Sequence, residues 1–152
     1  MRRANTTSVV LTVLSSVWGT IAIARAASLT DACSLLTVDQ VSSAMGTAVG
    51  APQKISTATC QWTVPGTMNR VTLMSSGAEA FNFWKKPLNP NVQSTPVSGV
   101  GDDAYFLKMA KQTGLAVKKG DTYFKLQVYS TVADDQKQAA EKQLATIVAS
   151  KL

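Results

Sequence analysis

The sequence has 152 residues, 45% of them hydrophobic, with 15 lysine or arginine and 9 aspartate or glutamate residues and a formal net charge of +6. It contains two cysteines and no histidine. The missing imidazole excludes Ser-His-Asp and Cys-His catalytic sites, and it leaves two cysteines without the histidines that would complete a zinc site.

The N-terminus has the pattern of a secretory signal peptide. Arg2 and Arg3 form a charged start, a mostly apolar run covers 9–23, and an A-x-A cleavage motif ends at Ala26. The apolar run is short and interrupted for a bilayer span, and a retained membrane helix is the alternative. We therefore predict a signal peptide over 1–26, with membrane contact only transiently during export.

The remaining residues, 27–152, are of the length of one domain. Without the three arginines of the predicted leader, 12 basic and 9 acidic residues remain, a net charge of +3. A charge of this size is typical of a soluble protein and does not indicate a nucleic-acid partner.

Cys33 raises a choice between a lipid anchor and a disulfide. Thr30, Asp31 and Ala32 precede it, and the carboxylate fits poorly in the small-residue box that a bacterial lipid anchor requires. Cys60 is the only other cysteine, and an even count in an exported chain favours pairing. We predict a disulfide between Cys33 and Cys60; two buried free thiols are the alternative.

The first part of the domain predicts a short helix and a hairpin. Thr37 and Gln40 form a capping box, after which a helix of about 8 residues ends at Gly46. A short strand and a turn are expected over 48–55. Alternating strand formers then predict strands over 59–64 and 70–74. If Cys60 faces the first helix, Trp62 and Val64 share its side, and the disulfide fastens that helix to the sheet.

The second part predicts a helix, a loop, three strands and a closing helix. The helix begins at Ser76, with an apolar face of Ala80, Phe81, Phe83 and Trp84, and the stretch from Pro87 to Ser98 has the composition of a loop. Three strands in meander order follow over 104–109, 115–118 and 122–129, with a turn over 111–114, and Asp134 opens the last helix. The fold class is α+β: an antiparallel sheet of about five strands covered by helices, in the order α-β-β-α-β-β-β-α, with one disulfide.

The chain contains DACSLLT at 31–37, then Val41 and Gly46, CQW at 60–62 and GVGDDAY at 99–105. These four short motifs resemble those of a widespread group of exported bacterial proteins and lipoproteins of unknown function. The resemblance implies a disulfide between the D-x-C and C-x-W cysteines. Many of these proteins are anchored through an earlier cysteine, which this chain lacks. The resemblance implies no established catalysis and no catalytic residues.

Other catalytic or cofactor sites have ordinary structural explanations. Asp102 and Asp103 are adjacent, and neighbours in an extended segment point to opposite sides, so a turn explains them better than a carboxylate pair. The Gly99-x-Gly101 motif lacks the third glycine and the preceding strand of a dinucleotide loop. We therefore predict no enzyme activity, no cofactor and no metal site.

Aromatic and basic residues suggest where a partner could bind. Trp62, Phe81, Phe83 and Trp84 are better explained as core, although an exposed Trp84 beside Lys85 and Lys86 would suit a carbohydrate or an anionic polymer. A second candidate surface is a basic, aromatic sheet face, for which an ordinary solvated strand face is the alternative. Its members are Lys108, Lys118, Tyr123, Lys125 and Tyr129.

These patterns predict a non-enzymatic, secreted or periplasmic binding or accessory domain of the bacterial cell envelope. Its partner would be an anionic envelope component or a protein. A secreted inhibitor of a hydrolase, using the loop from Pro87 to Ser98, is the alternative. A hydrolase using Asp102 or Asp103 is a third, weaker hypothesis.

Overall fold

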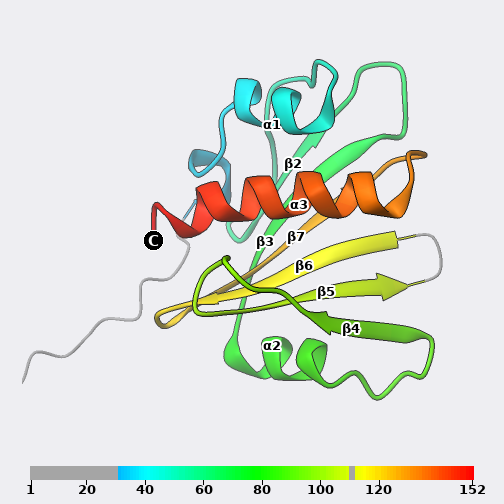
Figure 1. The fold of residues 1–152 in the computed structure, drawn as a ribbon. Helices are drawn as coiled ribbons and strands as arrows, with labels where there is room; N and C mark the ends of the chain where they lie inside the picture. The colour runs from blue at the N-terminus through cyan, green and yellow to red at the C-terminus, as the bar shows by residue number, and fades with distance from the viewer. Residues whose placement is uncertain (1–30, 110–111) are drawn as a thin grey trace, which may run out of the picture.

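The computed structural model describes residues 31–109 and 112–152, so the predicted signal peptide lies outside the described residues. These residues form one antiparallel seven-stranded sheet, three α-helices and a short 3₁₀ helix (Figure 1). In chain order the elements are η1 (Ala32–Ser34), α1 (Val38–Met45), β1 (Gln53–Ser56), β2 (Thr59–Thr63), β3 (Arg70–Ser76), α2 (Ala78–Lys85), β4 (Val92–Pro96), β5 (Asp103–Met109), β6 (Gln112–Lys119), β7 (Thr122–Tyr129) and α3 (Asp134–Ala149).

The sheet has the strand order β1-β2-β3-β7-β6-β5-β4, so the chain returns from α2 to the far edge and works back toward the centre. This confirms the α+β class and the antiparallel sheet covered by helices. The expected number of about five strands is wrong, because β1 and β4 extend the two edges. The expected element order lacked these two strands, although a short strand was expected over 48–55, where β1 begins at Gln53.

The β4 strand lies inside the stretch from Pro87 to Ser98, which the sequence predicted to be a loop. Its pairing with β5 makes it a strand, although its own composition is poor in strand formers. Val97 donates its amide to Ala104 at 2.9 Å, and the alternation of an antiparallel ladder then directs the position of Pro96 away from β5. A proline is tolerated there because its missing N–H would have faced the free edge.

The first helix confirms its predicted capping box. The amide of Gln40 donates to Thr37 Oγ1 at 3.2 Å, and the Gln40 side chain accepts from the Thr37 amide at 3.0 Å. Gly46 ends the helix with φ of 65°, a left-handed conformation that glycine adopts without steric cost.

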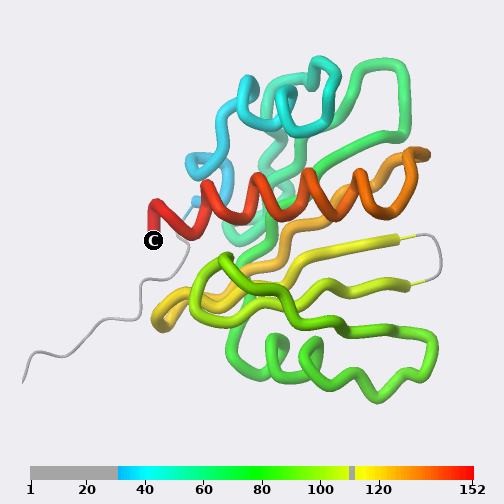
Figure 2. The backbone as a smooth tube through the Cα atoms, viewed as in Figure 1, coloured from blue at the N-terminus to red at the C-terminus, as the bar shows by residue number. Residues whose placement is uncertain are grey.

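The main core lies between the sheet and the layer of α1, α3 and η1. In Figure 2 the long α3 crosses the sheet with α1 beside it. Alternate strand residues face these helices and are buried, as predicted for Phe124, Leu126 and Val128 on β7. Trp62 and Val64 share the buried side of β2 with Cys60, also as predicted.

The helix α2 packs on the opposite face, over β5, β6 and β7. Phe81 inserts against Leu107 and Ala116, with Trp84 partly buried beside them. Phe83 was expected in this core but is 52% exposed, because its position on the helix points away from the sheet. The helix also begins two residues later than predicted, at Ala78 after Gly77.

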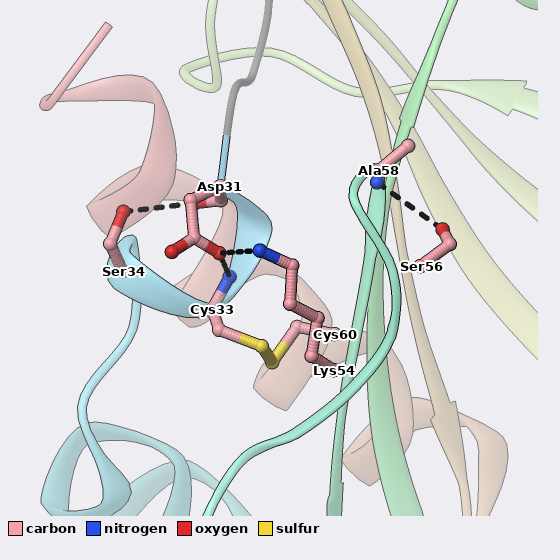
Figure 3. Close-up of polar contacts among 7 residues, drawn as sticks. All are labelled: Asp31, Cys33, Ser34, Lys54, Ser56, Ala58 and Cys60. Atoms are coloured by element: carbon pink, nitrogen blue, oxygen red, sulfur yellow. Dashed lines mark hydrogen bonds and ion pairs between the residues drawn. A yellow bond between two sulfur atoms is a disulfide. The ribbon is translucent and has the colours of Figure 1, made fainter.

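The disulfide between Cys33 and Cys60 is present, with a Cα–Cα distance of 5.0 Å. It joins β2 to η1 and not to the first α-helix. Figure 3 shows how polar contacts hold the same turn: the Asp31 carboxylate accepts from the Cys33 amide at 3.1 Å and lies 3.8 Å from Lys54 Nζ. The 3₁₀ turn is thereby fastened to β1 and β2 by one covalent bond and one ion pair.

Candidate functional site

The candidate site lies on the face of the sheet that carries α2. Tyr123, Lys125, Gln127 and Tyr129 alternate with the buried residues of β7, as predicted, and therefore point to this face. The helix covers one end of it, where Phe81 lies between Tyr105 and Tyr123 at centroid distances of 6.0 and 5.6 Å.

Three cation–aromatic contacts occur within residues 31–109 and 112–152, and all belong to this face. Arg70 lies 4.4 Å from the centroid of Tyr129, Lys85 5.1 Å from Tyr105 and Lys125 5.3 Å from Trp84. An ammonium or guanidinium above an aromatic ring is held by the ring quadrupole, at about 0.5–1 kcal/mol for exposed pairs. The aromatic rings therefore position the cations across the sheet.

Lys125 and Lys85 differ in their surroundings. Burial lowers the pKa of Lys125, and the Glu141 carboxylate acts in the opposite direction. The pKa of Lys85 is raised by its contact with Tyr105 and by Asp103, whose Oδ2 accepts from Nζ at 2.9 Å. Lys85 is thus already paired, whereas Lys125 is a partly buried cation beside an indole ring.

Lys118 projects from the same face, between Asp103 and Tyr123 in the strand register. Lys86 caps the end of α2 and is exposed. Among the described residues on α2, at its C-cap and at the strand positions that face the same side, the charged groups are therefore five cations and the two carboxylates of Glu79 and Asp103. The five are Arg70, Lys85, Lys86, Lys118 and Lys125.

Lys108 does not share this face, contrary to the sequence prediction. Its register partner is Thr113, on the α3 side, and Lys108 Nζ lies 2.9 Å from Asp134 Oδ2 at the start of α3. Lys137 and Lys108 together lower the pKa of Asp134. The alternation in 104–109 was visible in the sequence, but which parity faced α3 depended on the register with β6.

A row of uncharged polar residues on this face was missed by the sequence analysis. Gln53, Gln61, Thr72 and Gln127 are consecutive Cα partners across β1, β2, β3 and β7. We call these four residues the polar row. Gln127 Nε2 also donates to Gln112 Oε1 on β6 at 3.1 Å. Polar residues at alternate strand positions were the available signal, but only the register shows that they align.

Asp102 and Asp103 have separate partners. Asp102 accepts from the Gly120 amide at 2.7 Å and from Lys119 Nζ at 3.2 Å, and these two contacts lower its pKa. Asp103 binds Lys85 on the other side of the chain. The geometry is that of a structural turn, and the two carboxylates do not face one another.

The glycines of the GVGDDAY motif have a packing role in this turn. Gly101 has φ of 60°, and a Cβ at this position would collide with the carbonyl oxygen of Lys118 on β6. Close approach of two backbones therefore explains the glycine.

A separate groove of about 460 Å³ lies between the end of α1 and the first half of α3. Met45, Val128 and Lys137 contribute to its lining. Its residues belong to the α3 side of the sheet, so the groove and the candidate face do not meet.

The comparisons with known proteins gave no relative from which a function could be transferred: no protein-family model, no curated protein and no solved structure matches this chain. Among the described residues, no helix is long and apolar enough to cross a membrane.

Proposed function

We propose that this protein is an exported, disulfide-stabilised binding or accessory domain of the cell envelope, without enzymatic activity, that takes an anionic partner on the α2 side of its sheet. The observation that carries the proposal is the concentration of cations there: five basic side chains stand against two carboxylates, and three of the cations are positioned by aromatic rings. Cations fixed on one face attract an anionic partner and orient it on approach.

The disulfide supports a location outside the cytoplasm, secreted or periplasmic. Disulfides persist in oxidising compartments and are rare where glutathione and thioredoxin keep thiols reduced. The signal-peptide pattern of 1–26 and the resemblance of motifs in the chain to exported bacterial proteins agree with this location.

Retention on isolated envelope fractions tests the proposal. We expect the oxidised protein to bind, and the double variant K118E/K125E to lose at least tenfold in retention because it reverses two charges of the face. The matched control K108E/K142E makes the same charge change on the α3 side and should bind as the native protein does. Equal retention of all three proteins would contradict the proposal.

A secreted inhibitor of a hydrolase remains the second candidate, because Leu88 is 86% exposed in the segment that follows α2 and Phe83 on α2 is also exposed. Protruding apolar side chains of this kind can fill an enzyme subsite. A stoichiometric complex with a secreted hydrolase, weakened by L88D, would support it.

A further inference from the structure

Within the proposed function, on which this inference rests, we propose that the partner is a linear acidic polysaccharide that crosses β1, β2, β3 and β7 along the polar row. The row runs perpendicular to the strands on the uncovered half of the α2 side. It is flanked by one cation–aromatic pair on each side.

The flanking positions follow from the register. On one side of the row, Thr63, Arg70 and Tyr129 are consecutive partners. On the other side, Thr59, Met74 and Lys125 are consecutive partners, and the Lys125 ammonium lies 5.3 Å from the centroid of the Trp84 ring. None of the strand positions in the row or its flanks is a carboxylate.

Among the described elements, no helix packs on this half of the sheet. The packing contacts of α2 are with β5, β6 and β7, and those of α1, α3 and η1 place them on the opposite face. The row members on β2, β3 and β7 are partly exposed, and Gln53 on β1 is exposed. A polymer can therefore lie on the row without displacing any of the described helices or strands.

The spacing of the row matches the proposed ligand. Neighbouring strands lie about 4.8 Å apart, close to the length of one pyranose unit in a linear chain. Successive sugars would meet Gln53, Gln61, Thr72 and Gln127 in turn. Amide and hydroxyl groups both donate and accept hydrogen bonds, as sugar hydroxyls require.

The mixture of neutral side chains in the polar row and cations beside it also favours some polymers over others. Only two cations, Arg70 and Lys125, flank the row, and guanidinium binds carboxylate with two parallel hydrogen bonds. A phosphate backbone offers only oxygens that accept hydrogen bonds, so the amide oxygens of the row would find no donors on it. A glycan that carries both hydroxyls and carboxylates fits the mixture of neutral and basic side chains.

Titration calorimetry of the oxidised protein with polygalacturonate tests this inference. Dextran serves as an uncharged glycan and polyphosphate as an anion without sugar. We expect polygalacturonate to bind more tightly than either. The double variant Q61L/Q127L should weaken that binding at least tenfold, because hydrogen bonds of ordinary strength are lost at two points of the row. The matched variant Q93L lies on the opposite face of β4 and should leave it unchanged.

Three results would overturn the inference. Equal binding of polyphosphate and polygalacturonate, unaffected by Q61L/Q127L, would show a nonspecific anion surface and leave the proposed function standing. Envelope binding that depends on Lys118 and Lys125, with no affinity for polygalacturonate, would reject the glycan alone. If the native protein binds neither the envelope fractions nor polygalacturonate, the proposed function is rejected as well. Unfolding midpoints of the variants, measured in parallel, separate lost binding from lost folding.

Discussion

The carboxylate of Glu141 on α3 accepts a hydrogen bond from the backbone amide of Val128 on β7 at 3.0 Å. Glu141 is 0% exposed, and the same oxygen accepts from Thr113 Oγ1 on β6 at 2.9 Å. The β6–β7 ladder ends at Leu115 and Leu126, just before these residues. One buried side chain therefore ties the last helix to two strands where the strands separate.

The burial of Glu141 predicts that stability falls as the pH rises. Burial raises the pKa of Glu141 from 4.5 to about 7, so the folded protein holds this proton more tightly than the unfolded chain does. The stabilisation that comes from this tighter proton binding is complete below pH 4.5, declines as the pH rises to about 7 and then levels off. The total change in the free energy of unfolding is on the order of 3 kcal/mol. Denaturant unfolding from pH 4.5 to 8 measures it.

The variant E141Q isolates this contribution, since glutamine can still accept from Val128 but does not ionise in this range. We expect the difference in unfolding free energy between native and E141Q protein to change across pH 4.5–7. A constant difference would show that Glu141 does not titrate there.

Breaking the disulfide should cost about 3.5 kcal/mol of unfolding free energy, because the cross-link closes a loop with a sequence separation of 27 residues. Unfolding of the native protein with and without reductant measures the loss. The variant C33S/C60S is the control and should not respond to reductant.

The two aromatic residues of α2 should respond differently to truncation. Phe81 is buried against Leu107 and Ala116, so F81A should lower the unfolding free energy by about 3–5 kcal/mol. Phe83 is exposed, so F83A should change it by about 0.5 kcal/mol or less. Similar losses for both variants would contradict the placement of α2.

The two glycines before β5 offer a further matched pair. Both have positive φ, so an alanine costs about 1–2 kcal/mol at either position. At Gly101 the new Cβ also collides with the Lys118 carbonyl, whereas nothing lies within 4 Å of a Cβ at Gly99. G101A should therefore be less stable than G99A by a further 1–3 kcal/mol or so, measured as thermal or denaturant unfolding.

Local patterns in the sequence predicted the elements that depend on local interactions. The capping box of Thr37 and Gln40 placed α1, and the alternation of 122–129 gave the buried face of β7. The cysteine count and the resemblance both predicted the disulfide that the structure contains.

Features that depend on pairing were not predictable. The strand β4 exists because β5 lies beside it, and β6 begins at Gln112, paired with Met109, where a turn was expected. For the candidate site, the alternation on β7 was sufficient for Tyr123, Lys125 and Tyr129. The polar row required the register of four strands, and the separation of Lys108 required knowing which face α3 covers.

The anchoring of η1 also determines how the domain can be attached to something else. The Lys151 ammonium, two residues beyond α3, donates to the Leu35 carbonyl at 2.6 Å, so the two ends of the described chain lie at one corner (Figure 1). A reporter domain fused after Leu152 would start from this corner, away from β4 and α2. Surface immobilisation through that corner would present the opposite edge of the sheet to the solution.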